Sequence, residues 1–404
     1  MRSLLVVAFL CLIFSCNESS KKSELDLQKA DWSQIEENAK GSSVQMMMWQ
    51  GDPLINQYMN NYIVPEIRKK YGIELKINNG QGNSIVKTLI GEIEANKKKS
   101  SIDICWINGE TFYQLRQLKV LYGPFVQRLP NSQFINFDNP FIKFDFQQLV
   151  DGMECPWGNV QQIIIYDSLR TKLPPTNLKE IEIYVHEHPG RFTIPYEFTG
   201  ITLLKAWMIE LAEDKSVLSG PFDEEKYLNL STKLWEIVNH IKSNFWRNGE
   251  TFPESLALMH QMFANGELDF TMSNNDGEVD NKIIQNIFPS SAKAYVLESG
   301  TIQNSHYLGI PINSANKAAG MVVINFMISP EAQFQKLLPS VWGDGTILDI
   351  NKLSADWQYK FNNIPERTHS PKRIEINEKA IQEPVAEYMI RLFDDFRKYV
   401  IDKK

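Results

Sequence analysis

The sequence lacks the excess of basic residues that binding to nucleic acid requires. Its 404 residues include 49 Asp and Glu against 42 Lys and Arg, which gives a net charge of −7. Proteins that bind a phosphate backbone carry clustered lysines and arginines, and we interpret the KKK run at 97–99 as the solvated end of a helix. We therefore expect no nucleic-acid partner.

Short catalytic and metal-binding motifs are also missing. The patterns HExxH, GxSxG and GxxxxGK[ST] do not occur, which argues against zinc peptidases, serine hydrolases and P-loop nucleotide binding. The residues His186-Glu187-His188 alternate along the end of an expected helix and share no helical face, so we expect no metal ion there. We predict no catalytic residue, no cofactor and therefore no enzyme.

Cysteine is scarce, and it leaves one question open. Of the four cysteines, Cys105 and Cys155 fall in the part of the chain that is expected to fold. Cys105 lies in an apolar strand pattern, where buried free thiols are common. Export would permit a disulfide between the two cysteines, so both states stay open from the sequence.

The amino-terminal apolar run is too short to cross a bilayer. Residues 4–14 are apolar, whereas a membrane-spanning helix needs about 20 residues. The run follows Arg2 in the manner of a secretory signal, so residues 1–15 are predicted to be a signal peptide. The sequence Ile13-Phe14-Ser15-Cys16 resembles the lipobox of bacterial lipoproteins, which implies that Cys16 is acylated and that residues 16–41 form a polar tether at a membrane surface.

Strand-like and helix-like patterns alternate after the tether. Strands are predicted at 44–49, 73–77 and 102–107, with helices at 55–67 and 85–95 between them. Such alternation is typical of a parallel sheet that is flanked by helices.

The stretch PWGNVQQIIIYD, residues 156–167, is predicted to cross between two lobes. Pro156 and Gly158 break any preceding helix, and the apolar run at 163–166 indicates a strand buried on both faces. The alternation then starts again. We predict strands at 192–195, 268–272, 294–298 and 305–311, and helices at 201–212, 224–245, 253–264, 315–328 and 378–402.

Several stretches in this order resemble the extracellular solute-binding proteins of ABC importers, family 1. They are DICWINGE (103–110), PWGNVQQIIIYD, NGELDFTMSNNDGEV (265–279) and SHYLGIPINSANKAAGMVVINFMISPEAQ (305–333), while HPGRFTIP (188–195) is similar to a poorly characterised lipoprotein branch. The resemblance implies an α/β, type II two-lobed periplasmic-binding-protein fold. Each lobe would be a mixed, mostly parallel sheet flanked by helices, and a multi-strand hinge would join the lobes. The implied boundaries are 42–160 plus 309–340 for lobe 1 and 161–308 plus 341–404 for lobe 2.

Loops at strand ends supply the candidate ligand-binding residues, because ligands of two-lobed α/β proteins bind there. The candidates are Trp49, Gln50, Asp52, Asn108, Glu110, Trp157, Tyr196, Glu197, Thr199, Asn274, Asp276 and Tyr307. This set is aromatic and acidic, which favours an organic cation or a planar heterocycle such as a thiamine-like compound. Trp49 could equally be a core residue and Glu110 a helix cap.

The resulting hypothesis is an exported, monomeric lipoprotein that faces the periplasm or the cell exterior. It would capture a small solute and deliver it to ABC permease and ATPase subunits without catalysis. The alternative is a surface lipoprotein enzyme acting on a carbohydrate or an ester, with two of Asp52, Glu110 and Glu197 as acid and base roughly 5 to 9.5 Å apart. A structural or adhesion lipoprotein is a third class, and it would bind no small molecule.

Overall fold

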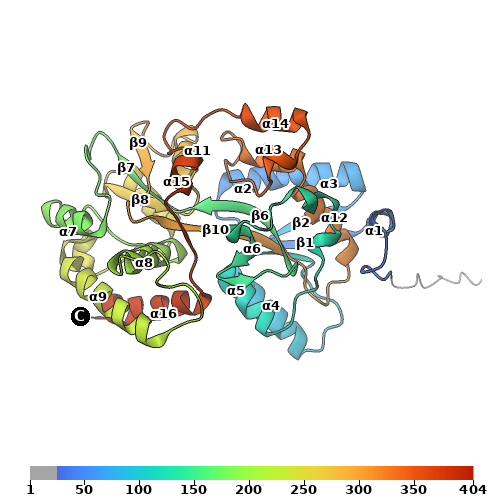
Figure 1. Cartoon of the computed structure of the whole chain (residues 1–404), viewed down its shortest axis with the longest axis horizontal. Coiled ribbons are helices and arrows are strands. Elements are labelled where there is room, and N and C mark those ends of the chain that lie inside the picture. Colours follow the sequence, from blue (N-terminus) through green and yellow to red (C-terminus); the bar gives the residue numbers. More distant parts are fainter. Residues whose placement is uncertain (1–24, 404) are drawn as a thin grey trace, which may run out of the picture.

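The computed structural model describes residues 25–403 and shows two α/β lobes side by side (Figure 1). The proposed signal peptide and Cys16 lie outside the described residues. We call lobe 1 the six-stranded sheet with the helices packed on it, and lobe 2 the three-stranded sheet with its helices. The two-lobed α/β fold expected from the sequence is confirmed.

The sheet of lobe 1 begins with three parallel strands. β1 (Ser43–Met48) pairs with β2 (Glu74–Asn79) and with β3 (Ile104–Ile107). Alternate residues of β1 are fully buried, as a strand in a sheet covered by helices requires. Because the three strands are parallel, their carboxyl ends lie at one edge of the sheet, and Asp52, just after β1, contacts Lys282 of lobe 2 there. β10 (Thr301–Gly309) continues this sheet and pairs antiparallel with β3 and β6 (Glu154–Gln161), and parallel with β11 (Ala380–Gln382).

Helices cover both faces of this sheet. They are α1 (Trp32–Ala39), α2 (Pro53–Tyr58), α3 (Val64–Tyr71), α4 (Gly82–Glu94), α5 (Gly109–Gln117), α6 (Pro140–Lys143), α12 (Lys317–Met327), α13 (Pro330–Leu337) and α14 (Ala355–Asn362). A π-helical turn, Met59–Ile63, joins α2 to α3. A short hairpin of β4 (Phe144–Asp145) and β5 (Gln148–Leu149) follows α6.

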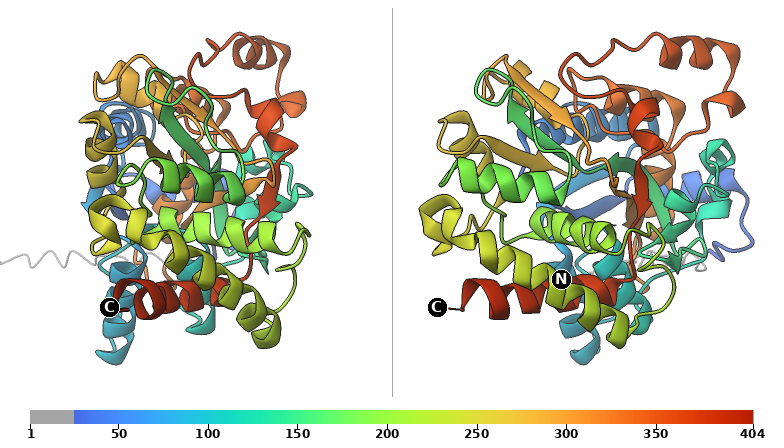
Figure 2. Two further views of the ribbon diagram at one scale, coloured as in Figure 1. Left: turned by 90° about the vertical axis from the view of Figure 1, so that its left-hand side faces the viewer. Right: turned by 60° about the vertical axis from the view of Figure 1, so that its left-hand side comes forward.

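Lobe 2 is built on a small sheet in the order β8-β7-β9. β7 (Ile163–Asp167) is the central strand and pairs antiparallel with β8 (Phe270–Ser273) and with β9 (Ala292–Tyr295). The helices of this lobe are α7 (Leu178–Glu187), α8 (Phe198–Leu211), α9 (Glu224–Ile241), α10 (Leu256–Ala264), α11 (Glu278–Ile284), α15 (Arg373–Asn377) and α16 (Ala386–Phe396). Most of α8 is buried, and α16 packs against α8 and α9 at the carboxyl end of the chain (Figures 1 and 2).

The predicted crossing at 156–167 is confirmed. β6 belongs to the sheet of lobe 1 and β7 to the sheet of lobe 2, and only Gln162 lies between them. The chain returns from β9 to β10, and it crosses again after β11, which pairs in lobe 1 just before α16 packs in lobe 2. Two lobes are therefore joined by several neighbouring segments, as in a hinge.

Two predicted elements are wrong. The segment 192–195 is buried but forms no strand, and Pro195, which ends it, cannot donate a ladder hydrogen bond. The helix predicted at 378–402 begins only at Ala386, because β11 occupies 380–382. Pro384 explains the later start, since the residue before a proline is driven away from helical backbone angles.

The two cysteines are free and buried. Cys105 on β3 lies opposite Gly309, and Cys155 on β6 lies opposite Leu308, so β10 separates them. Two strand spacings amount to roughly 9 to 10 Å, which exceeds the reach of a disulfide. No helix within residues 25–403 combines the length and the apolarity that crossing a bilayer would require.

Candidate functional site

The first predicted loop follows β1 at the edge that faces lobe 2. Trp49 keeps 37% of its surface exposed, so its ring is available on this edge. The Gln50 carbonyl accepts a hydrogen bond from Asn56 Nδ2 at 2.9 Å, and its backbone N–H donates to Asn79 Oδ1 at 3.3 Å. The loop is thus tied to the ends of α2 and β2, while the Trp49 ring stays accessible.

Asp52 in the same loop is committed to structural contacts. Its Oδ1 caps α2 by accepting hydrogen bonds from the N–H groups of Leu54 at 2.7 Å and Ile55 at 3.2 Å. Its Oδ2 lies 2.7 Å from Nζ of Lys282 in lobe 2, and Lys282 also binds Glu278 at 3.1 Å. Asp52 therefore forms an ion pair between the two lobes.

The amino end of α5 carries the second group of candidates. Asn108 is the residue before the helix, and Glu110 lies in its first turn. Glu110 Oε1 accepts a hydrogen bond from Gln114 Nε2 at 3.0 Å. Burial raises the pKa of Glu110, and the charge of nearby Lys205 only partly opposes this shift. The side chain is half-buried and faces a cation that belongs to lobe 2.

The amino end of α8 carries the third group. Glu197 caps the helix, with Oε1 accepting from the Thr199 N–H at 2.8 Å. Thr199 in turn accepts hydrogen bonds from Gln162 Nε2 at its carbonyl, 2.8 Å, and from Asn274 Nδ2 at Oγ1, 3.3 Å. Burial without a cationic partner raises the pKa of Glu197 to about 7. A Cβ at Gly200 would lie 1.9 Å from the Pro195 carbonyl oxygen, so this tight turn into α8 requires glycine.

The amino ends of α5 and α8 meet through two phenylalanines. The Gly109 backbone packs on Phe146 so closely that a Cβ would lie 1.6 Å from Phe146 Cδ2. The Phe146 ring is 6.5 Å from that of Phe198, the first residue of α8. Lys205 lies over both rings, with Nζ 5.0 Å and 5.5 Å from their centroids. Candidates from different lobes are therefore brought to one place.

Lys205 is the buried cation at this meeting point. Its side chain is fully buried and forms an ion pair with Glu383, whose other carboxylate oxygen accepts from Asn304 Nδ2 at 3.1 Å. Burial lowers the pKa of Lys205, whereas Glu383 and Glu110 act in the opposite direction. The positive charge of Lys205 is thus already balanced by a residue of the connecting segment.

Five candidates make contacts that occupy them within the fold. Trp157 is fully buried against Trp106 and Trp342, with ring centroids 5.2 Å away in each case. Tyr307 is fully buried and donates to the Ile142 carbonyl at 3.1 Å. Tyr196 packs on Phe393, with ring centroids 4.6 Å apart. Asp276 binds Arg367 at 2.6 Å and Arg373 at 2.8 Å. The fifth is Asp52, which pairs with Lys282 as described above. These two arginines overcome burial and lower the pKa of Asp276 to about 2.

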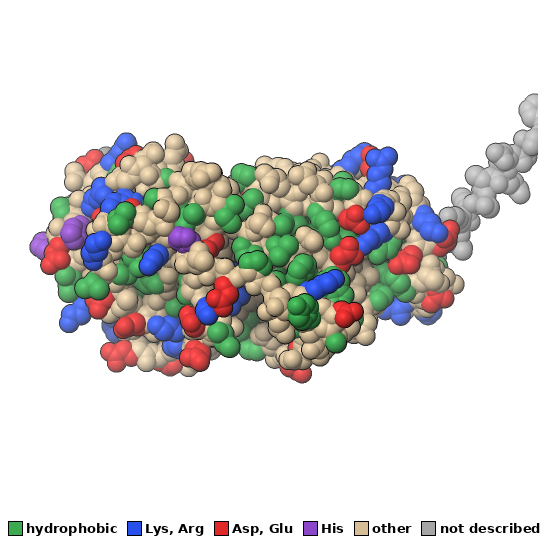
Figure 3. Space-filling model, turned by 90° about the horizontal axis from the view of Figure 1, so that it is seen from above, with side chains coloured by type: hydrophobic (Ala, Val, Ile, Leu, Met, Phe, Trp, Pro, Cys, Tyr) green, Lys and Arg blue, Asp and Glu red, His purple; other side chains and the backbone are tan. Residues whose placement is uncertain are grey.

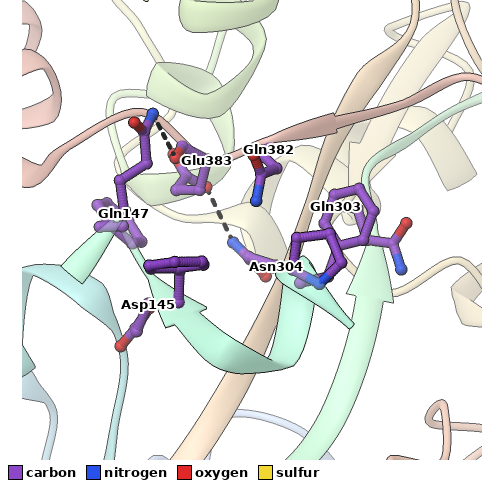
Figure 4. A pocket seen from close by; sticks show the side chains of 10 residues that line it. Asp145, Gln147, Gln303, Asn304, Gln382 and Glu383 are labelled. Atoms are coloured by element: carbon purple, nitrogen blue, oxygen red, sulfur yellow. Dashed lines mark hydrogen bonds between the residues drawn. The ribbon is translucent and has the colours of Figure 1, made fainter. Parts of the chain in front are cut away.

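Two hollows lie beside the hinge strands. The smaller has a volume of about 10 Å³, room for roughly one water, and amide and carboxylate side chains line it: Gln147, Gln303, Asn304, Gln382 and Glu383, with Asp145 turned away (Figure 4). The larger, of about 410 Å³, is lined by the segments 136–142 and 346–351 and by Asn159. None of the candidate ligand-binding residues lines either hollow.

Charge is unevenly distributed over the surface. Figure 3 shows the elongated molecule from above, with lysines, arginines and acids more numerous toward the two ends and hydrophobic side chains gathered over the middle. The middle of this face is where the lobes adjoin.

Sequence reasoning missed three residues of the meeting point: Gln162, Lys205 and Phe146. Lys205 left a signal, because a lysine inside the otherwise apolar run ITLLKAWMI must find a buried partner. Gln162 left a weaker one as the polar residue between two strands. Phe146 belongs to a hairpin whose strands are too short to show a periodic pattern in the sequence.

Comparisons with known proteins place these features in context. The sequence profile of the family described as bacterial extracellular solute-binding protein matches residues 63–360. Protein YnjB of Escherichia coli (strain K12) is 32% identical over 328 residues, which is 80% of this chain and 84% of YnjB.

Solved structures share the fold. An ABC transporter from Clostridium perfringens is 16% identical with a TM-score of 0.60, over 88% of this chain and 98% of that one. The Tp0655 (TpPotD) lipoprotein of Treponema pallidum is 11% identical with a TM-score of 0.62, over 89% and 99%.

Proposed function

The chain belongs to the bacterial extracellular solute-binding proteins, and from this membership we propose that it captures a small solute between its lobes and delivers it to ABC permease and ATPase subunits. The main support is that Phe146, packed on the amino end of α5, lies 6.5 Å from Phe198 at the amino end of α8, and that Glu110 and Glu197 belong to these two helix starts. We propose that the protein acts as a monomer and releases the solute chemically unchanged.

Seven of the candidates form the proposed solute-binding set. They are Trp49, Gln50, Asn108, Glu110, Glu197, Thr199 and Asn274, which lie at strand ends or helix starts on the facing sides of the lobes. Asp52, Trp157, Tyr196, Asp276 and Tyr307 would support this set without touching the solute, because other side chains and backbone groups already occupy them. The solute would be an organic cation or a thiamine-like heterocycle, attracted by unpaired carboxylates.

Capture would proceed by rotation of the lobes about the crossing segments. The Asp52–Lys282 ion pair joins the lobes, so it must break when they open. A solute would favour the closed state by the difference between its affinities for the closed and open forms.

We also propose that Cys16 carries a lipid and anchors the protein in a membrane on the periplasmic or exterior side. Mass spectrometry of the protein from its native host should show acyl chains on Cys16, and Cys16→Ser should yield a soluble protein without them. An unmodified Cys16 in the wild-type protein would refute the anchor and would leave solute binding untouched.

Thermal unfolding in the presence of a solute library tests the binding function. A true solute should stabilise the mature protein by about 2.7 kcal/mol at a hundredfold excess over Kd, bind with one-to-one stoichiometry and be recovered unchanged. Conversion of the solute would identify an enzyme instead. Stabilisation by neutral sugars or anions alone would show that the solute class is wrong.

A further inference from the structure

The proposed cleft holds two carboxylates, Glu110 and Glu197, that form no direct ion pair, although the charge of Lys205 acts on Glu110 from a longer distance. Among the ion pairs formed within residues 25–403, Asp52, Asp276, Glu278 and Glu383 each bind a lysine or an arginine, whereas Glu110 and Glu197 take part in none. Glu110 accepts a hydrogen bond from Gln114 of its own helix, and the first turn of α8 donates to Glu197 through Thr199 and Gly200. Both carboxylates are thus held by neutral donors, and a cationic donor would add a charge-assisted hydrogen bond. A buried carboxylate without a partner costs free energy that the fold does not recover.

A third acceptor points to a ligand independently. Gln162 is only 1% exposed, and its Nε2 donates a hydrogen bond to the Thr199 carbonyl. Its Oε1 is buried without any hydrogen-bond partner. Buried polar atoms in proteins are nearly always paired, so Gln162 Oε1, between β6 and β7 and beside the first turn of α8, is an acceptor for which a ligand could supply the donor.

Aromatic rings offer the solute little surface here. Trp157 and Tyr307 are fully buried in lobe 1, and Tyr196 packs on the carboxyl-terminal helix. Phe146 and Phe198 are covered by Lys205, so their faces already hold a cation. Of the predicted aromatic candidates, Trp49 alone keeps an exposed ring among the described residues. A solute would therefore find one exposed aromatic ring for stacking but two carboxylates for hydrogen bonding.

We propose that the solute is recognised through N–H donors of a primary or secondary ammonium group that bridges Glu110 of lobe 1 and Glu197 of lobe 2, with Gln162 Oε1 as a further acceptor. The inference rests on the proposed solute-binding function and narrows its solute class, because a quaternary ammonium or an aromatic cation without N–H groups could not satisfy these oxygens. One carboxylate on each lobe lets the same ammonium group draw the lobes together.

The bound solute can be classified without knowing its identity. The mature protein is incubated with a peptone extract, freed of unbound solutes and denatured, and the released solute is treated with dansyl chloride, which labels primary and secondary amines but not quaternary ones. Mass spectrometry should show a released solute that gains the dansyl group.

Charge-removing variants connect the solute to the two carboxylates. Glu110→Gln and Glu197→Gln preserve the helix contacts, because a carboxamide oxygen still accepts from Gln114 or from the Thr199 N–H. Each should bind the isolated solute about 10- to 100-fold more weakly, the loss of one charge-assisted hydrogen bond. The control Glu225→Gln removes an exposed acid of α9 and should leave affinity unchanged.

The outcomes separate this inference from the broader function. A released solute that cannot be labelled, or full affinity in both Glu→Gln variants, would overturn the ammonium proposal and leave solute binding intact. Release of no solute at all, together with no stabilisation by any library member, would overturn both.

Discussion

The acids where the two lobes meet fall into two contrasting regions. At the α2–α11 end, Asp52 and Glu278 share Lys282, and His260 and Lys282 lower the pKa of Glu278 to about 2 despite its burial. At the α5–α8 end, Glu110 and Glu197 form no direct ion pair, and burial raises the pKa of each, which the charge of Lys205 opposes only in part at Glu110. The acids of the first region are paired within the fold, whereas the second region is where we propose that a cationic solute binds.

The difference teaches which acidic residues point to function. Burial destabilises the charged form of a carboxylate that has no ion pair, even where it caps a helix as Glu197 does, so such a carboxylate favours a cationic ligand or a proton. Acidic residues that form ion pairs, such as Asp52 and Glu278, instead stabilise the contact between the lobes. Breaking the paired region should therefore damage stability, and altering the unpaired region should change binding while stability holds or improves.

The largest effect is expected for Asp276→Asn. Asp276 is 1% exposed and binds two arginines, so its replacement leaves two partly buried guanidinium groups with one neutral partner. We expect the free energy of unfolding to fall by about 3 to 5 kcal/mol, measured by urea denaturation at neutral pH. Glu110→Gln serves as the control from the unpaired region. A loss below about 1 kcal/mol would contradict the structural role assigned to Asp276.

Lys282→Met should have the next largest effect. It removes the cation that joins Asp52 of lobe 1 to Glu278 of lobe 2 and leaves both acids buried. We expect a loss of about 2 to 3 kcal/mol and a larger radius of gyration in solution scattering, because the lobes lose a contact that opposes opening. An unchanged radius and an unchanged stability would show that the pair does not hold the lobes together.

A smaller, pH-dependent effect is expected at Glu197. Its pKa rises from 4.5 to about 7 in the folded protein, so the protonated form stabilises the fold below pH 4.5 and this contribution is lost as the pH rises to about 7. Between pH 5 and pH 8 the wild type should lose about 1 to 2 kcal/mol more than Glu197→Gln, after allowance for partial exposure. Denaturation curves of the two proteins that stay parallel across this range would disprove the shift.

The smallest effect is expected for Arg391→Ala. Arg391 binds Glu224 through two hydrogen bonds of 2.9 and 3.0 Å, but both side chains are largely exposed. We expect a change of about 0.5 kcal/mol or less in the free energy of unfolding, which salt should reduce further. A loss as large as that of Lys282→Met would mean that pairing, rather than burial, separates the two regions.

Much of the fold could be predicted because local patterns determine it. The apolar run of β7, the helix starts after β1 and β3, and the alternation of elements all follow from short stretches of sequence. Where one residue overrides a pattern, as Pro384 does before α16, the prediction went wrong by several residues. Local information was sufficient for the architecture.

The site could be predicted only in part, because pairing is a long-range property. Asp52 and Glu197 both follow strand or loop segments and both cap a helix, so nothing near them in sequence separates them. Their difference depends on Lys282, which is 230 residues from Asp52 in the chain. Similarly, Arg367 lies 91 residues beyond Asp276. Spacing could place acids near the cleft but could not show which ones were neutralised.

Gln162 connects the crossing segments of the hinge with the first turn of α8. Its backbone N–H is held by the Ile302 carbonyl on a second crossing segment, and its side chain is held by the first turn of α8. Gln162 is the single residue between β6 and β7, so we expect a rotation of one sheet against the other to change its backbone torsion angles. If the solute donates to Gln162 Oε1 as proposed, the residue between the two sheets would also contact the solute, and binding would act on the hinge directly.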